Sequence, residues 1–223
     1  MDSSSPLAHA WDVSTDEART LQNQLASEVE AVPLDPPAEA VETVAGVDVG
    51  VKDGVAQAAI AVLRLADMTV VDKAVHRMPV PFPYVPGLLS FREMPAILPA
   101  LERLSTVPDV FMTDSQGLAH PRRFGLGCHL GVWLDRPTLG VAKSRFVGQP
   151  EGDLSPEKGN HVPLVHEGDV VGAVVRTRTD VKPVYVSIGH RITLDDAIRL
   201  TLRCSPRYKI PEPTRAADRL SRS

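Results

Sequence analysis

The chain has 223 residues, enough for one domain of ordinary size, and its 43% hydrophobic and 23% charged residues exclude a disordered chain. No apolar run approaches the roughly 18–20 residues that cross a bilayer, and the first residues lack the pattern of a secretory signal. We therefore expect a cytoplasmic protein without membrane contact. The two cysteines, Cys128 and Cys204, imply no disulfide framework and are expected to be buried apolar residues.

The net charge of −4 is unevenly distributed along the chain. Residues 1–42 contain nine acidic residues against Arg19 alone, a charge of −8, so residues 43–223 carry about +4. A mildly basic body is compatible with a polyanionic partner such as nucleic acid. For the domain organisation we expect a loose acidic leader over residues 1–13 and a single domain over residues 14–223.

An amphipathic helix is predicted first. Ser14 and Glu17 have the spacing of a capping box, in which each side chain accepts a hydrogen bond from the backbone of the other. Apolar residues then recur at intervals of four, at Leu21, Leu25 and Val29. The proline-rich stretch 33–37 cannot continue a helix and ends this segment.

Three β-type segments follow, at Thr43–Val51, Val55–Leu65 and Met68–His76. The first two are so uniformly apolar that we expect strands buried on both faces. Their close spacing predicts a three-stranded antiparallel meander at one side of a sheet. The next stretch, Pro79–Pro86, holds four prolines in eight residues and is expected to be an extended loop.

Strands and helices alternate in the rest of the chain. The segment Leu88–Arg103 is helical but interrupted, and Pro95 suits the first residue of a second helix. Further strands are expected at Asp109–Thr113, Thr138–Ala142, Val170–Arg176 and Val184–Ile188, and further helices at Phe124–Leu134 and Thr193–Cys204. After the first helix, the predicted elements begin with a run of strands and continue with alternating strands and helices. This order indicates an α/β fold, with a mixed sheet covered by helices.

Three acidic residues occupy unusual positions. Asp48 interrupts an apolar strand, where an unpaired charge would cost several kcal/mol. Asp114 ends another apolar strand, which is where open α/β sheets bind ligands, and Glu93 stands at the junction of the two helical segments. Each has a structural alternative: a salt-bridged strand acid, a loop-capping acid and a solvated helix acid. Together they suit a hard divalent cation such as Mg²⁺.

The segment after the second aspartate is dense in polar chemistry. It contains His120 and the adjacent pair Arg122 and Arg123, whose guanidinium groups suit phosphate. The alternatives are a structural histidine and a solvated pair of arginines. Lys143 ends a further apolar strand, so we expect its ammonium group to reach the same edge of the sheet.

Four strings resemble the endonuclease V family of deoxyinosine-directed repair nucleases: PYVPGLLSFRE at 83–93, AHPRRFGL at 119–126, GVAKS at 140–144 and PEPTR at 211–215. They lie in the family's order, and the resemblance extends over about residues 15–220. It implies a ribonuclease-H-like fold, that is, a mixed sheet flanked by helices with acids gathered at one edge.

The resemblance also implies a set of catalytic residues: Asp48, Glu93, Asp114, His120, Lys143 and Asp218. In the family pattern the aspartates at 48 and 114 bind the metal, Mg²⁺ with Mn²⁺ as a substitute, and the glutamate is the third carboxylate. Asp218 falls on the family's fourth acidic or histidine position. His120 and Lys143 match residues used near the scissile phosphate.

Tyr84 matches the aromatic residue of a wedge loop that enters DNA where the altered base is removed; the alternative is a ring packed on the prolines of its own loop. The resemblance assigns contact with DNA or the base to Pro83, Tyr84, Val85, Pro86, Gly87, Leu88, Ser115, Gly117, Arg122 and Arg123. Ser115 stands where the family usually has glycine, so we expect it to narrow or alter the base pocket. Cys128 likewise stands where serine is common.

The activity implied is Mg²⁺-dependent cleavage of DNA that contains deoxyinosine. The family cuts the second phosphodiester bond 3′ to the lesion and leaves a 3′-hydroxyl and a 5′-phosphate, after extruding the base into a pocket. Two alternatives stay open: cleavage of inosine-containing RNA, and an inactive inosine-binding module. We expect the protein to act as a monomer.

Overall fold

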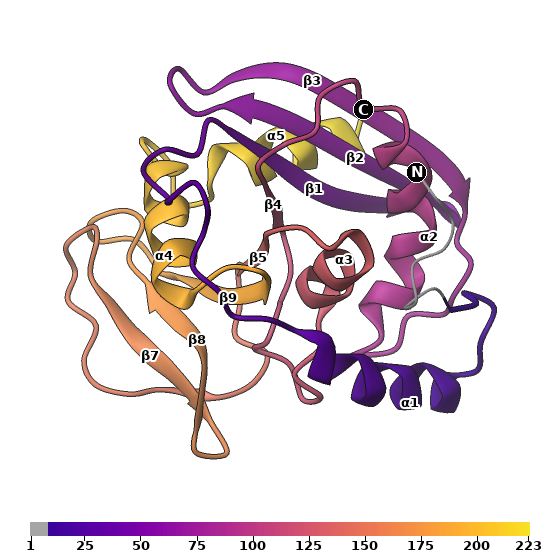
Figure 1. Cartoon of the computed structure of the whole chain (residues 1–223), viewed down its shortest axis with the longest axis horizontal. Coiled ribbons are helices and arrows are strands. Elements are labelled where there is room, and N and C mark those ends of the chain that lie inside the picture. Colours follow the sequence, from indigo (N-terminus) through magenta and orange to yellow (C-terminus); the bar gives the residue numbers. More distant parts are fainter. Residues whose placement is uncertain (1–8) are drawn as a thin grey trace.

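The computed structural model describes residues 9–223 and shows one mixed sheet flanked by helices (Figure 1). The strands are β1 (Thr43–Lys52), β2 (Val55–Arg64), β3 (Thr69–Pro79), β4 (Val110–Thr113), β5 (Thr138–Ala142), β6 (Gln149–Pro150), β7 (His161–His166), β8 (Asp169–Val175) and β9 (Val184–His190). The helices are α1 (Thr15–Leu25), a short 3₁₀ turn (Ala26–Glu28), α2 (Leu89–Leu101), α3 (Leu126–Leu134), α4 (Leu194–Arg203) and α5 (Glu212–Ser221).

The sheet has the order β3-β2-β1-β4-β5-β9-β8-β7-β6. Its first three strands form the predicted antiparallel meander. β1, β4 and β5 are parallel neighbours, with Val47 beside Thr113 and Thr113 beside Gly140. The carboxyl ends of these three strands therefore meet at one edge of the sheet, which confirms the predicted mixed α/β architecture.

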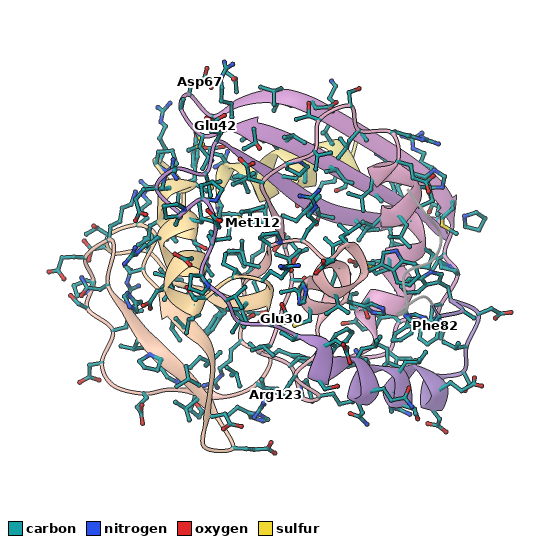
Figure 2. The ribbon with its side chains drawn as sticks, in the orientation of Figure 1. Glu30, Glu42, Asp67, Phe82, Met112 and Arg123 are labelled. Atoms are coloured by element: carbon teal, nitrogen blue, oxygen red, sulfur yellow. The ribbon has the colours of Figure 1, made fainter. Side chains whose placement is uncertain are left out.

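Both faces of the sheet are covered, which explains the uniformly apolar strands. On one face α2 and α3 pack against Ala45 and Val47 of β1, and on the other face α4 and α5 cover the sheet. Met112 of β4 is fully buried near the middle of the molecule, whereas Asp67 lies at its periphery (Figure 2). Within residues 9–223, no helix combines the length and apolar character that crossing a membrane requires.

The predicted starts of α1 and α4 are confirmed. At α1 the Ser14 hydroxyl accepts from the Glu17 amide (3.3 Å), and the Glu17 carboxylate accepts from the Ser14 amide (2.7 Å). The Thr193 hydroxyl likewise accepts from the Asp196 amide at the start of α4 (3.2 Å).

The predicted interruption of α2 is wrong. The helix runs unbroken through Pro95 and Pro99, although each proline removes a backbone donor. Both prolines are only partly buried, while Phe91, Met94 and Ile97 pack into the core from the same helix. Burial of that apolar face outweighs two lost hydrogen bonds, so Glu93 lies within one continuous helix.

Strands β6 and β7 and helix α5 were not predicted from the sequence. β7 contains Pro163, which lacks a ladder donor, and β6 is only two residues long. Of the predicted leader, residues 1–8 lie outside the described residues. Trp11 and Val13 pack against a buried group that includes Phe82 and Phe91, so this part of the chain contacts the body of the protein.

Candidate active site

Polar side chains lie at the point where the parallel pairing between neighbouring strands ends. Asp48 lies in β1, one residue beyond the part that pairs with β4. Asp114 directly follows β4, and its amide donates to the carbonyl of Val47 (3.2 Å). Lys143 directly follows β5. Neighbouring parallel strands in register thus bring two carboxylates and an ammonium group to one edge, as the sequence predicted.

Helix α5 adds a third carboxylate to this edge because it packs unusually close to β1. A Cβ atom on Gly46 would lie 1.9 Å from the Pro213 carbonyl oxygen, and one on Gly50 would lie 2.5 Å from the Ser221 carbonyl oxygen. Only glycine fits at these positions. Their close approach lets the Ser221 hydroxyl donate to Asp48 Oδ2 (2.5 Å) and brings Asp218 beside the other two aspartates.

Asp48, Asp114 and Asp218 form the carboxylate cluster. Each offers an oxygen atom, and these atoms lie within 4.8 Å of one another. Oxygen donors that converge in this way fit a hard divalent cation, which would relieve the repulsion between them. The donor set therefore agrees with the Mg²⁺ or Mn²⁺ implied by the family resemblance.

Lys143 lies against the carboxylate cluster. Its ammonium group hydrogen-bonds Asp114 and lies 3.9 Å from Asp218 Oδ1. Burial acts to lower the pKa of Lys143, but the hydrogen bond and the charge of Asp114 raise it above its ordinary value, so the lysine stays charged. Burial, opposed by Lys143, raises the pKa of Asp114.

Glu93 approaches the same acids from α2. Burial of its carboxyl group, together with the charges of Asp48 and Asp114, raises the pKa of Glu93 to about 8. Its oxygens do not belong to the group within 4.8 Å. The charges of the cluster therefore raise the pKa of Glu93, but Glu93 is not a member of the cluster; the third member is Asp218.

A pocket of about 410 Å³ adjoins the carboxylate cluster and includes Asp114 and Lys143 in its wall. Of the residues predicted to bind DNA or the base, it is lined by Tyr84, Val85, Pro86, Gly87 and Ser115. The predicted residues Pro83, Leu88, Gly117, Arg122 and Arg123 are not part of its lining. Leu88 is buried in the core, and Gly117 lies against β9, where a Cβ atom would be 2.0 Å from the Ile188 carbonyl oxygen.

One carbonyl group of the loop that carries Tyr84 accepts three side-chain hydrogen bonds. The Gly87 carbonyl accepts from Gln22 Nε2 (2.9 Å), His120 Nε2 (3.0 Å) and Arg122 Nη2 (2.8 Å). Arg122 also donates through Nε to Gln22 Oε1 (2.6 Å). Tyr84 itself is 71% exposed beside the pocket, so its ring is not packed away on the protein.

His120 is buried and neutral in this arrangement. Burial, and secondarily the charge of Arg122, lower the pKa of His120 to about 4. Its Nδ1 accepts from the Arg122 amide (3.2 Å), so Nε2 carries the proton donated to Gly87. The histidine lines the pocket and fastens the loop of Tyr84 at the same time.

Arg123 lies near the turn between β7 and β8 (Figure 2). Its guanidinium group contacts His166 Nδ1 (2.5 Å), the His166 carbonyl oxygen (2.8 Å) and Asp169 (3.4 Å). Both predicted phosphate-binding arginines therefore bond other parts of the chain. Their contact with phosphate stays a prediction.

Several pocket residues were missed by sequence reasoning, among them Gln22, Leu89, Ser90, Gln116, Ser144, Arg145 and Phe146. Ser90 lies inside one of the family-like strings, which was its only signal. Gln22 lies on the buried face of α1, and no sequence pattern pointed to it as a pocket residue. Ser115 lines the pocket, and its buried hydroxyl donates to Thr113 Oγ1 (2.8 Å); its effect on the base pocket stays a prediction.

The sheet order, the acids at its edge and the adjoining pocket define a ribonuclease-H-like α/β protein. A family model described as Endonuclease V matches residues 23–219. Endonuclease V of Trichormus variabilis is 50% identical over 96% of this chain and 96% of its own. The chain belongs to the endonuclease V family, and it is an endonuclease.

Solved structures agree with this assignment. Endonuclease V from Streptomyces avermitilis superposes with a TM-score of 0.90, at 46% identity, over 96% of this chain and 93% of its own. A Ciona intestinalis endonuclease V variant superposes with a TM-score of 0.82, at 26% identity, over 94% of this chain and 97% of its own. That protein was crystallised with a 23mer DNA containing an inosine followed by a ribo-adenosine.

Proposed function

We propose that this endonuclease recognises deoxyinosine in DNA and, with Mg²⁺, cleaves the second phosphodiester bond 3′ to it, leaving a 3′-hydroxyl and a 5′-phosphate. The observation that carries the proposal is the carboxylate cluster, whose oxygens lie within 4.8 Å of one another at the wall of the pocket. A site for a cation and a site for a base are thus adjacent, as cleavage near a recognised base requires.

The roles of the residues follow from their places. Asp48, Asp114 and Asp218 would hold Mg²⁺, which supplies Lewis-acid activation of water and stabilises charge on the leaving oxygen. Lys143, kept charged by Asp114, is positioned to stabilise the negative charge that develops on the attacked phosphate. Glu93 supplies a further carboxyl group beside the cluster.

Base recognition is assigned to the pocket and its loop. Tyr84 is exposed, whereas the backbone that carries it is fixed through Gly87, so the ring can enter a duplex at low entropic cost. Stacking of the ring on neighbouring bases would fill the gap left by an extruded base. Extrusion costs least where pairing is already weak, as it is for hypoxanthine.

Cleavage of inosine-containing RNA is the second candidate. The ribo-adenosine that follows the inosine in the Ciona complex favours it, because that protein was crystallised with a ribonucleotide directly after the inosine. An inactive binding module is the least supported candidate, because binding a base does not require three converging carboxylates.

The test maps the cut on end-labelled oligonucleotides that contain one inosine, as matched DNA and RNA, with and without Mg²⁺. We expect a Mg²⁺-dependent product of the length set by the second bond 3′ to inosine, made faster on DNA. Faster cutting of RNA would favour the second candidate. Tight binding with no product in either Mg²⁺ or Mn²⁺ would contradict an active nuclease.

A further inference from the structure

A group of rings between the start of the described chain and helices α2 and α3 has no part in the mechanism above. His9 lies among Trp11, Phe91 and Trp133, with ring centroids 4.5, 5.6 and 5.5 Å from its own. Phe91 belongs to α2 and Trp133 to α3. The segment 9–11 therefore covers the contact between the two helices.

Two histidines and a serine form a hydrogen-bonded chain through this group. His9 Nε2 lies 2.8 Å from His129 Nε2, and His129 Nδ1 lies 2.9 Å from Ser90 Oγ. His129 and Ser90 are each 1% exposed, so water does not compete for the bond between them, whereas His9 is partly buried. Burial, and secondarily His9, keep the pKa of His129 well below its usual range, so His129 is neutral.

One backbone group fixes which ring nitrogen of His9 carries a proton. His9 Nδ1 lies 2.8 Å from the Ala10 carbonyl oxygen, which can only accept, so Nδ1 carries the proton. In the tautomer with its single proton on Nδ1, His9 accepts through Nε2 from His129 Nε2–H. His129 Nδ1 is left as an acceptor, and the Ser90 hydroxyl donates to it.

The hydrogen-bonded chain from His9 ends at the first turn of α2, which also carries groups of the proposed active site. Ser90 lies in the first turn of α2, where no side chain caps the helix, and it lines the pocket. Glu93 follows almost one turn later on the same helix. No hydrogen bond to the Glu93 carboxyl group is seen within residues 9–223, so its position depends on how α2 is held. The Tyr84 loop, by contrast, has its own anchors at Gly87.

We propose that His9 and His129 are positioning residues that hold the start of α2, and with it Glu93, through the Ser90 hydroxyl. This proposal rests on the proposed function only for its effect on catalysis. The segment around His9 thereby takes part in shaping the active site, although it touches neither the pocket nor the carboxylate cluster.

The test uses the full-length protein and two variants, each of which removes one end of the hydrogen-bonded chain of side chains. His9→Phe keeps a ring in the aromatic group but removes the acceptor, and Ser90→Ala removes the donor. Nitrogen-15 NMR of the histidine side chains reports which ring nitrogen of His129 carries the proton, with His129→Asn used to assign the signal. Trp11→Phe is the matched control, because it alters the packing of the same aromatic group without removing a donor or acceptor of the hydrogen-bonded chain.

We expect His129 to be protonated at Nε2 in the wild type and at Nδ1 in His9→Phe, since a Nδ1–H can still donate to Ser90. On an inosine-containing oligonucleotide, kcat should fall about tenfold in Ser90→Ala. It should fall by a smaller factor in His9→Phe, where His129 still bonds Ser90 through Nδ1–H, and KM should change less than twofold in both. The double variant His9→Phe/Ser90→Ala should be no slower than Ser90→Ala alone, because His9 acts on α2 only through Ser90. Trp11→Phe should keep the wild-type proton position and kcat.

An unchanged proton position in His9→Phe, or kcat losses that add up in the double variant, would overturn the proposal. So would an equal fall of kcat in Trp11→Phe, which would indicate packing alone. The NMR measurement needs no substrate. A wild-type protein that leaves every inosine-containing oligonucleotide uncut would therefore overturn the proposed function. It would not decide the direction of the hydrogen bonds between His9, His129 and Ser90.

Discussion

Asp48 combines a position in a central strand with a partly buried carboxylate that faces two others. We expect Asp48→Asn to lower kcat about a thousandfold or more, because a ligand oxygen with full charge is lost from the cation site. The thermal midpoint of the metal-free protein should hold or rise, since repulsion within the cluster decreases and an amide oxygen can still accept from Ser221.

The control for this substitution is Asp53→Asn in the exposed turn after β1, which carries the same charge change away from the site. It should leave kcat within twofold of the wild type. Near-normal turnover of folded Asp48→Asn at ordinary Mg²⁺ concentration would contradict the assignment of Asp48 as a metal ligand.

Tyr84 is an exposed aromatic residue that lines the pocket. Tyr84→Ala should weaken binding to an inosine-containing duplex by roughly ten- to hundredfold, because base stacking on an aromatic ring contributes about 1–3 kcal/mol. The loss should be smaller on a single strand, which has no paired stack to hold open. Binding is measured in Ca²⁺, which prevents cleavage.

Tyr84→Phe keeps the stacking ring and should bind the duplex within about threefold of the wild type. Cation affinity should be unchanged in both variants, since Tyr84 is not part of the carboxylate cluster. Equal duplex affinity of Tyr84→Ala and the wild type would remove this residue from base recognition.

At the scale of elements, the seating of α5 on β1 positions the third acid. Gly46→Ala would place a Cβ atom 1.9 Å from the backbone of Pro213, which has no flexible side chain to yield. The helix must shift or the strand must bend, so we expect the free energy of unfolding to fall by about 3 kcal/mol. Denaturant titration with urea measures it.

The same displacement moves Asp218 away from the other aspartates, so activity should fall even under conditions where the variant is folded. Gly54→Asn is the control, because it also replaces a β1–β2 glycine but has open space around it and a φ of +76° that asparagine tolerates. If Gly46→Ala were as stable and as active as Gly54→Asn, α5 would not need its close approach to β1.

At the scale of the whole molecule, buried neutral histidines make the fold sensitive to acid. The pKa of His120 is about 4 in the folded protein, against about 6.5 when the chain is unfolded. Between pH 6.5 and pH 4 the unfolded chain therefore binds a proton that the folded protein does not. The free energy of unfolding decreases as the pH is lowered through this range. The expected loss is about 3 kcal/mol.

Comparison with His120→Gln isolates this contribution. Between pH 7 and pH 4, in metal-free buffer, the wild type should lose about 3 kcal/mol more of its unfolding free energy than the variant does. Glu93, with its pKa raised to about 8, acts in the opposite direction between pH 8 and about pH 4.5, but it is present in both proteins and cancels. A constant difference across this range would mean that His120 is not buried as a neutral group.

Much of the fold was readable from local patterns. Uniformly apolar strands predicted a sheet covered on both faces, and the capping box predicted the start of α1, because these signals depend on neighbours within a few residues. Asp48 inside an apolar strand and Asp114 at the end of another indicated a shared cation site, because an unpaired charge is costly in such a strand and open α/β sheets bind ligands at strand ends. The continuity of α2 was misjudged, because proline propensity is local and the burial that overrides it is not.

What only the tertiary structure decided lies in contacts between distant parts of the chain. Asp218 reaches the carboxylate cluster because α5 seats on two glycines of β1, and the contact between Ser221 and Asp48 joins residues 173 positions apart. Gln22 reaches the loop of Gly87 across 65 positions, and His9 reaches His129 across 120. No periodicity or spacing encodes such pairs, because their geometry exists only once the sheet has formed and the helices have packed on it.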